Sequence, residues 1–218
     1  AVESTIARNS DWVLPIHAGP EIGVASTKAF LGQMIVLYIL CLKISKLRKD
    51  INDLKYQNNI KNLITLPEAI RDSLKIENDV QAMAKEFLDA KGSMFLGRGS
   101  SFPIALEGAL KLKELSYLHA EGYPAGEMKH GPLALIEEGL PVIVIAPKDK
   151  YFEKTISNMQ EVIARGGKIL FITDNKKDSL NENIRFGLRI PHIDSLLSPI
   201  LLTLPLQILA YHVALLKN

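Results

Sequence analysis

The second half of the chain alternates between short apolar runs and longer segments with helical spacing. The apolar runs, some rich in β-branched residues, predict strands over 93–96, 141–146, 168–173 and 188–190. The segments between and after them predict helices over 103–118, 151–165 and about 196–216. Short apolar strands that alternate with helices favour an α/β domain whose parallel sheet is covered on both faces.

The N-terminal part of the chain has a different pattern. It predicts a short strand over 12–16, a turn, and then an apolar helix that ends at about Leu42. Residues 43–61 are polar and rich in Lys and Arg, which is typical of a solvated connector or a surface helix. Pro67 suits the first turn of a new helix. The expected division is a first part over 1–45, a connector over 46–66 and a domain over 67–218.

A weak internal repeat bears on this division. The strand, loop and apolar helix that carry Leu14 and Gln33 recur around Leu188 and Gln207. The matches are few, so chance is the alternative. A real repeat means that the chain holds the C-terminal strand and helix of one domain and then a whole second copy. Since an isolated strand-helix piece cannot bury its own apolar surface, residues 1–45 are expected to need a partner surface.

Composition excludes some classes of protein. The 26 Lys and Arg against 24 Asp and Glu give a net charge of +2, and 47% of the residues are apolar. The apolar content argues against disorder, and the balanced charge gives no reason to expect nucleic-acid binding. The single cysteine, Cys41, cannot form an internal disulfide, and the chain opens without a signal-peptide pattern. A cytoplasmic location is therefore expected.

Two uncharged stretches, 29–42 and 196–216, are long and apolar. A helix that is hydrophobic all round fits either a protein core or a membrane. Pro199, Pro205 and Gln207 in the second stretch favour a buried helix of an α/β protein, and the first stretch is interpreted in the same way. No membrane partner is predicted.

The turn over 96–103 is the first candidate for chemistry. Gly97 and Gly99 let backbone amides approach a ligand, and the helix that follows favours an anion at its N-terminus. The turn lacks the third glycine and downstream acid of a dinucleotide site, and it lacks the Gly-Lys-Ser/Thr of a P-loop. Two interpretations stay open. The loop could hold a sugar or a monophosphate, or it is a tight turn with Ser100 or Ser101 as the helix N-cap.

The helix over 103–118 carries the second candidate. Glu107, Lys111 and Glu114 lie within an arc of about 60° when successive residues turn by about 100°. Apolar residues occupy most of the remaining surface, so these charges are expected to face a confined space. A lysine beside a carboxylate there suits proton transfer. The alternative is a pair of ordinary ion pairs on an exposed stripe.

Two further stretches hold polar candidates. His130 lies in a loop punctuated by Gly and Pro, so it could be aimed into a cleft, or it is a surface histidine. Ser26 and Thr27 open the first apolar helix and could cap it. The other histidines lack metal-ligand spacing, and there is no cysteine cluster, so no metal site is predicted.

Several stretches, taken together, resemble one family. In order along the chain they are 21–30, 96–99, 103–114, 126–135 and 210–215. They are similar to the C-terminal isomerase part of the glutamine–fructose-6-phosphate aminotransferases, also called glucosamine-6-phosphate synthases. The resemblance implies three-layer, flavodoxin-like sugar isomerase (SIS) domains with parallel sheets. The chain would hold the C-terminal strand and helix of a first SIS domain and nearly all of a second.

The resemblance also implies a reaction and roles for five residues. Fructose 6-phosphate and ammonia from glutamine would give glucosamine 6-phosphate. Glu114 would move a proton between C1 and C2 of the open-chain sugar, and Lys111 would assist. His130 would open the sugar ring in the site of the neighbouring subunit of a homodimer. Val24 and Ser26 would contact the substrate, and no cofactor is implied.

Other parts of the family's pattern have no match in this chain. The N-terminal glutaminase domain is absent, and Cys41 does not match its nucleophile. The phosphate-binding loop of the first SIS domain would precede Ala1, and the Schiff-base lysine would follow the last residue, so Lys217 is not given that role. The chain alone is therefore expected to be a fragment without synthase activity. Two alternatives stay open: a non-catalytic sugar-phosphate-binding SIS domain, and an enzyme similar to the fructosamine deglycases.

Overall fold

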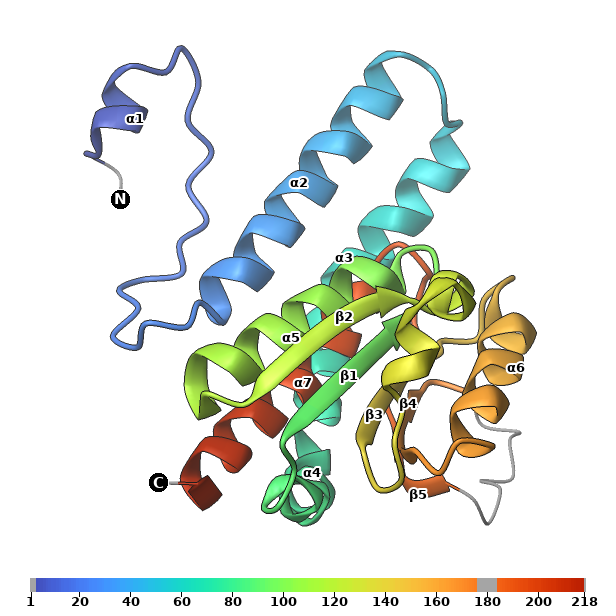
Figure 1. Cartoon of the computed structure of the whole chain (residues 1–218). Helices are drawn as coiled ribbons and strands as arrows, with labels where there is room; N and C mark the ends of the chain where they lie inside the picture. The colour runs from blue at the N-terminus through green and yellow to red at the C-terminus, as the bar shows by residue number, and fades with distance from the viewer. Residues whose placement is uncertain (1–2, 176–183, 218) are drawn as a thin grey trace. The chain divides into compact units, whose positions relative to one another are not determined.

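The computed structural model describes residues 3–175 and 184–217, and the chain divides into two compact units, Ala1–Lys61 and Asn62–Asn218. The boundary between the units lies inside the stretch that the sequence suggested as a connector. The first unit contains α1 (Thr5–Arg8), α2 (Lys28–Leu47) and the beginning of α3 (Asp53–Ser73), which continues into the second unit (Figure 1).

The predicted strand over 12–16 is wrong. These residues are not paired with a strand, and every strand among the described residues belongs to the second unit. An extended segment becomes a strand only where a neighbour takes up its backbone N–H and C=O groups. Trp12, in the middle of the apolar pattern, is 91% exposed.

The two long apolar helices differ in burial. By length and composition alone, both α2 and α7 (Ser198–Lys217) could cross a membrane. Only 6% of the apolar window of α2 is buried, so the prediction of a buried helix over 29–42 is wrong for the described chain. In α7 the buried share is 67%, as predicted for a core helix of an α/β protein. The difference arises because α7 packs against α5 (Ser101–Ser116) and α4 (Glu77–Ala84), whereas the first unit offers α2 no sheet face.

Pro67 does not begin a helix. It lies inside α3, whose first turn is fixed by Asn52, since the Asn52 side-chain oxygen accepts a hydrogen bond from the backbone N–H of Lys55 (2.8 Å). Asparagine is a preferred N-cap residue. Proline inside a helix removes one backbone hydrogen bond but does not always end the helix.

The second unit is built on one parallel sheet. Its strands are β1 (Gly92–Gly97), β2 (His119–Pro124), β3 (Pro141–Ile145), β4 (Lys168–Thr173) and β5 (Ile184–Arg189). They lie in the order β2-β1-β3-β4-β5, and every neighbouring pair is parallel. This is the flavodoxin-like strand order, so the predicted α/β class and parallel sheet are confirmed.

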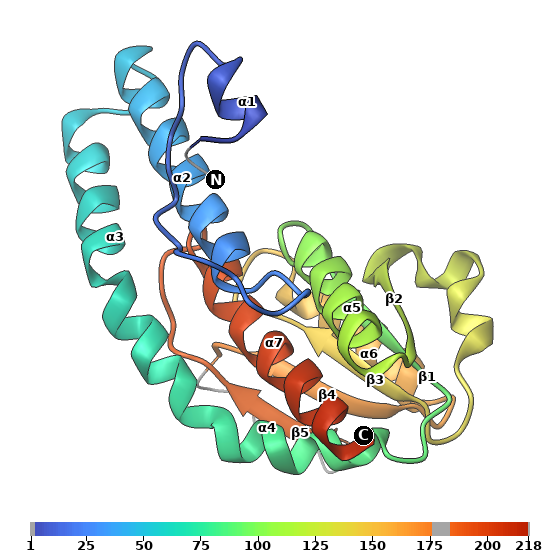
Figure 2. The ribbon, with the colours of Figure 1, turned by 90° about the vertical axis from the view of Figure 1, so that its left-hand side faces the viewer.

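Helices cover both faces of the sheet, which makes three layers (Figure 2). One face carries α4 (Glu77–Ala84), α5 (Ser101–Ser116) and α7, and the other carries α6 (Phe152–Ile163). Short 3₁₀ turns complete the unit: η1 (Leu74–Ile76), η2 (Lys85–Phe87), η3 (Ala125–His130) and η4 (Pro132–Leu135). The tight contact between α5 and α7 depends on Gly108, where a Cβ would lie 2.7 Å from Leu206 Cδ1.

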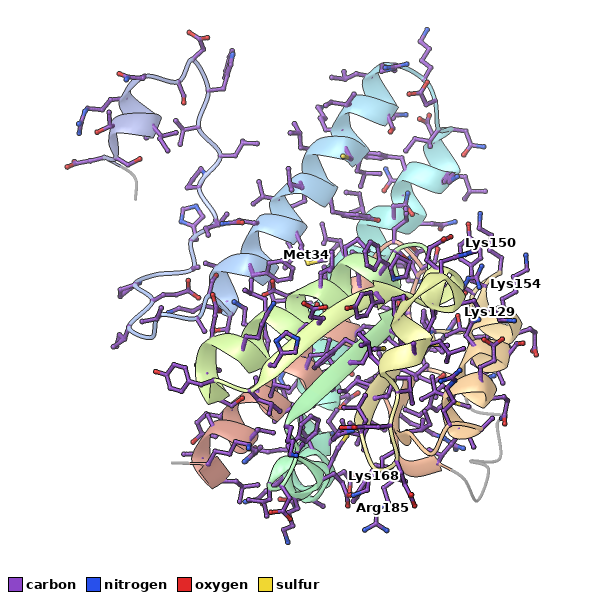
Figure 3. The ribbon with its side chains drawn as sticks, viewed as in Figure 1. Met34, Lys129, Lys150, Lys154, Lys168 and Arg185 are labelled. Carbon is purple, nitrogen blue, oxygen red and sulfur yellow. The ribbon has the colours of Figure 1, made fainter. Side chains whose placement is uncertain are left out.

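The central strands form the core. All four residues from Val142 to Ile145 are fully buried, and burial of each such side chain stabilises the fold by about 1.5–3 kcal/mol. At the amino ends of β4 and β5, Lys168 and Arg185 both pair with Glu86, at 3.1 and 2.9 Å. Figure 3 labels the two basic side chains. Burial raises the pKa of the Glu86 carboxyl, the two hydrogen bonds lower it, and the net direction is downward.

Candidate active site

The turn between β1 and α5 is a tight turn. A Cβ on Gly97 would overlap the backbone oxygen of Ser101, and Gly99 has a positive φ of 54°. Glycine is therefore required at both positions for the geometry of the turn. Ser100 stands at the N-cap, but its side chain makes no capping hydrogen bond, and the buried Ser101 hydroxyl has no partner in the described chain. Of the two serines suggested as the N-cap residue, Ser100 takes that position, but its hydroxyl does not supply the capping hydrogen bond.

Arg98 ties this turn to two other elements. Its Nη1 donates a hydrogen bond to Asn158 Oδ1 of α6 (2.9 Å). Its guanidinium also lies so close to Gly126 of η3 that a Cβ there would be 2.9 Å from Nη2. The pairing of Lys129 with Glu161 (3.0 Å) ties η3 to α6 a second time, and Figure 3 shows Lys129 beside that helix. The segment that carries His130 is thus held from both sides.

The predicted charge cluster on α5 is present and centred on Lys111. The Lys111 side chain is only 4% exposed, and its Nζ donates a hydrogen bond to Glu114 Oε2 at 2.7 Å. Glu107 Oε1 lies 3.6 Å from the same Nζ. An ordinary exposed stripe would leave the ammonium in water, so burial of Lys111 excludes that alternative for the lysine.

Glu114 combines a fixed orientation with access to solvent. One third of its side chain (33%) is exposed, while Oε2 is held by Lys111. The carboxylate therefore has a second oxygen, Oε1, that can take or give a proton. A positioned carboxylate with one free oxygen is suited to general acid–base chemistry.

Glu107 is the member of the cluster whose charge is least well compensated. Its Oε1 is buried without a hydrogen bond, and burial raises the pKa of this carboxyl although the Lys111 ammonium opposes the shift. A raised pKa means that the folded state binds more protons than the unfolded state between the two pKa values. The contribution of Glu107 to stability is thus fully present below the ordinary glutamate range and is lost as the pH rises through the raised pKa.

We expect Glu107→Gln to remove this pH dependence. Urea unfolding of both proteins between about pH 4 and pH 7 should show the wild type losing stability relative to the variant as the pH rises. A wild type that gains stability relative to the variant over this range would mean that Lys111 outweighs burial at this carboxyl.

His130 is the last residue of η3 and is exposed. Its side chain is 77% exposed, and Nε2 lies 3.9 Å from Glu127 Oε2, a loose pair on the same turn. Among the described residues no hydrogen bond connects His130 with Lys111 or Glu114. The structure therefore brings Lys111 and Glu114 together and leaves His130 free to meet another surface.

Val24 and Ser26 lie in the first unit, in the loop before α2, and Val24 is almost fully exposed. The cap of α2 comes from Glu21 and not from a Ser26 hydroxyl. One oxygen of Glu21 accepts hydrogen bonds from the backbone N–H groups of Thr27 (2.8 Å) and Ala29 (3.3 Å). The bond from Thr27 is the main reason that the pKa of Glu21 is lowered.

Sequence reasoning missed a second polar cluster, at the carboxyl ends of the strands. Asp174 follows β4 and hydrogen-bonds to Nδ1 of His192 (2.7 Å), which follows β5. The signal was present in the sequence, since both residues come shortly after a predicted strand and such positions meet at one edge of a parallel sheet. In the described chain, no group of three or more His, Cys, Asp or Glu could hold a metal ion.

The sequence of the chain is similar to those of known proteins. The model of the SIS domain family matches residues 86–217, so the chain belongs to the SIS domain family. The glutamine–fructose-6-phosphate aminotransferase (isomerizing) of Agrobacterium fabrum is 51% identical over 214 residues, which are 97% of this chain and 35% of that protein. The relative from Bartonella henselae is 49% identical over 215 residues, again 35% of its length. The resemblance that the motifs predicted is confirmed.

Solved structures of related proteins have the same fold. The C-terminal domain of glucosamine-fructose-6-phosphate aminotransferase from Francisella tularensis superimposes with a TM-score of 0.96 at 42% identity, covering 100% of this chain and 62% of that one. A glucosamine-6-phosphate deaminase from Thermotoga maritima gives a TM-score of 0.70 at 26% identity, covering 98% of this chain and 59% of that one. In sequence, the chain spans about a third of the length of the curated aminotransferases it matches.

Proposed function

We propose that the chain is the isomerase part of an enzyme that converts fructose 6-phosphate and ammonia to glucosamine 6-phosphate and water. The observation that carries the proposal is the buried Lys111 ammonium that fixes the Glu114 carboxylate. The relatives at about half identity bear the name of this activity, and that supports the choice of substrate.

Glu114 is the proton-transfer group in this proposal. After ammonia replaces the C2 carbonyl oxygen as water, the carboxylate takes a proton from C1 of the open-chain sugar. The electron pair of that C–H bond forms a C1=C2 double bond, and the imine nitrogen takes up a proton as its double bond to C2 opens. Glu114 then returns the proton to C2 while the C1 hydroxyl loses its proton, so C1 becomes the carbonyl carbon of the aldose and C2 keeps the amino group. Lys111 acts by position, because its hydrogen bond to Oε2 leaves Oε1 to carry the proton in both directions.

His130, Val24 and Ser26 have supporting roles in the proposal. His130 opens the sugar ring in the site of the neighbouring subunit of a homodimer, which agrees with its exposure and with its having no bond to Glu114. Val24 and Ser26 contact the sugar. We also propose that 1–45 is the end of a first SIS domain, that 46–66 is a connector and that 67–218 is a second SIS domain, in a cytoplasmic enzyme completed by a glutaminase domain.

The alternatives are less well supported. A non-catalytic sugar-phosphate-binding domain has no need for a buried lysine that orients a partly exposed carboxylate. A reaction in the opposite direction, or a deglycase reaction, is compatible with the fold, as the deaminase of Thermotoga maritima illustrates. The identity to that protein is only 26%, against about 50% for the aminotransferases.

The test compares this 218-residue chain with the complete protein that the resemblance implies. With fructose 6-phosphate and ammonium, the complete protein is expected to form glucosamine 6-phosphate and the chain alone to form none. A complete protein that releases ammonia from glucosamine 6-phosphate but cannot make it under any ammonium concentration would contradict the proposal. Product formed by the chain alone would show that no further segment is needed for the reaction.

A further inference from the structure

A cavity of about 490 Å³ lies at the carboxyl edge of the sheet, away from Lys111 and Glu114. Its walls come from the loops that follow β1, β3, β4 and β5, from Asn62 of α3 and from the first residue of α7. In Figure 2 the heads of the strand arrows and the start of α7 lie toward the same side. Between β1 and β3 the chain order reverses, and open α/β sheets bind ligands outside such a point.

A buried carboxylate organises this cavity. Asp174 is 3% exposed; its Oδ1 accepts a hydrogen bond from the backbone N–H of Lys148 (2.6 Å), and its Oδ2 holds Nδ1 of His192. Three loops are therefore pinned by one side chain. In the neutral tautomer that donates its Nδ1 proton to the carboxylate, the ring presents the lone pair of Nε2, and more than half of the side chain is exposed.

A hydroxyl without a partner faces the same cavity. Ser198, the first residue of α7, lines the cavity and is 5% exposed, yet its Oγ makes no hydrogen bond within the described chain. A buried polar atom without a partner is unfavourable unless something outside the chain completes it. Asp149 and Asp194 also line the cavity, and each has one oxygen that accepts a local backbone N–H and a second oxygen that remains available.

The charges of the lining disfavour a phosphate. Three aspartates, Asp149, Asp174 and Asp194, stand against one lysine and one histidine. Lys148 is exposed, so its ammonium is hydrated. A dianion would meet carboxylates at short range, whereas a cation with hydroxyl groups would supply the donors that these acceptors lack.

We propose that this cavity binds a small hydroxylated amine, with its ammonium group at the free aspartate oxygens and a hydroxyl at Ser198 and His192 Nε2. An amino sugar without a phosphate has this chemistry. The inference does not rest on the proposed function, because none of these residues belongs to the Lys111–Glu114 cluster.

The experiment titrates the isotope-labelled 218-residue chain with glucosamine, glucose and glucose 6-phosphate and follows backbone amide signals by NMR. Glucosamine is expected to shift the signals of Lys148, His192 and Ser198 in a saturable way. Glucose, which lacks the charge, should bind at least about fivefold more weakly, and glucose 6-phosphate should leave these signals unchanged. Shifts confined to α5 would place the ligand at the proposed active site and overturn this inference alone.

Variants separate the contributions. Ser198→Ala should weaken glucosamine binding about fivefold, through one lost hydrogen bond, without lowering stability. Ser93→Ala is the matched control, because Ser93 is also a buried serine whose Oγ has no partner within the described residues, but it is the second residue of β1, at the amino edge of the sheet. Asp194→Asn keeps the oxygen that accepts from Leu196 and removes the charge, so it should weaken glucosamine about tenfold and leave glucose unchanged.

Three results would overturn the inference. They are equal affinity for glucose and glucosamine, occupation of the cavity by glucose 6-phosphate, and unchanged glucosamine binding in both Ser198→Ala and Asp194→Asn. If Ser198→Ala does not fold, the comparison of Asp194→Asn with the wild type decides alone.

Discussion

Replacing Glu114 with glutamine in the complete protein is expected to lower the turnover number for glucosamine 6-phosphate by about 10³-fold, the usual contribution of a positioned acid–base group. The amide is nearly the same size as the carboxyl group and can still accept a hydrogen bond from Lys111, but it cannot take a proton from carbon. Binding of fructose 6-phosphate should therefore be retained. The measurement is a steady-state assay together with a direct binding titration.

Glu153→Gln is the matched control for this prediction. Glu153 is an exposed glutamate at the start of α6, so its neutralisation changes the net charge in the same way without touching the cluster. Its turnover should equal that of the wild type. A Glu114→Gln enzyme with wild-type turnover would remove Glu114 from the chemistry. A variant that loses turnover only because it no longer binds the sugar would make Glu114 a binding residue.

Replacing Lys111 with methionine is expected to lower the free energy of unfolding by about 3 kcal/mol, toward the lower end of the cost of breaking a buried ion pair. Methionine fills much of the same space but leaves Glu107 and Glu114 without their shared cation. Glu107 is almost buried and carries most of this cost, whereas partial exposure of Glu114 reduces its share. Urea unfolding at pH 7 measures the change.

Lys113→Met gives the contrast on the same helix. Lys113 is exposed, so its loss should change stability by less than about 0.5 kcal/mol. Adding Glu107→Gln to Lys111→Met should recover part of the lost stability, because the nearly buried uncompensated charge is then gone. Equal effects of Lys111→Met and Lys113→Met would show that burial of the ammonium has no energetic consequence.

The sequence predicted the elements whose pattern is set by burial alone. Strands β3 and β4 are enclosed on both faces, so their apolar runs identified them, and the face of α5 with Glu107, Lys111 and Glu114 followed from helical spacing. Strand β2 was missed because it lies at the edge of the sheet, where half-exposed positions such as Glu121 and Tyr123 hide the apolar pattern. The fourth predicted strand is the end of β5, and residues 176–183 lie outside the described residues.

Features that depend on tertiary contacts could not be predicted. The strand expected over 12–16 has no pairing partner in the described chain, and helix α2 has no sheet to cover. The expectation that Pro67 begins a helix also failed, because the side chain of Asn52 caps α3 at an earlier position and the helix continues through Pro67. The Asp174–His192 pair joins residues 18 positions apart in sequence; the predicted strands place both at the carboxyl edge of the sheet, but only the pairing of β4 with β5 makes their loops neighbours.

In the proposed mechanism one carboxylate, Glu114, both removes the proton from C1 and returns it to C2. Fructose 6-phosphate deuterated at C1 tests this most directly, with mass spectrometry or NMR of the glucosamine 6-phosphate that the complete protein forms. With the wild type, a measurable share of the deuterium is expected at C2 of the product, and this transfer is expected to be lost in Glu114→Gln. Deuterium transfer that continues at the wild-type rate in Glu114→Gln would contradict it.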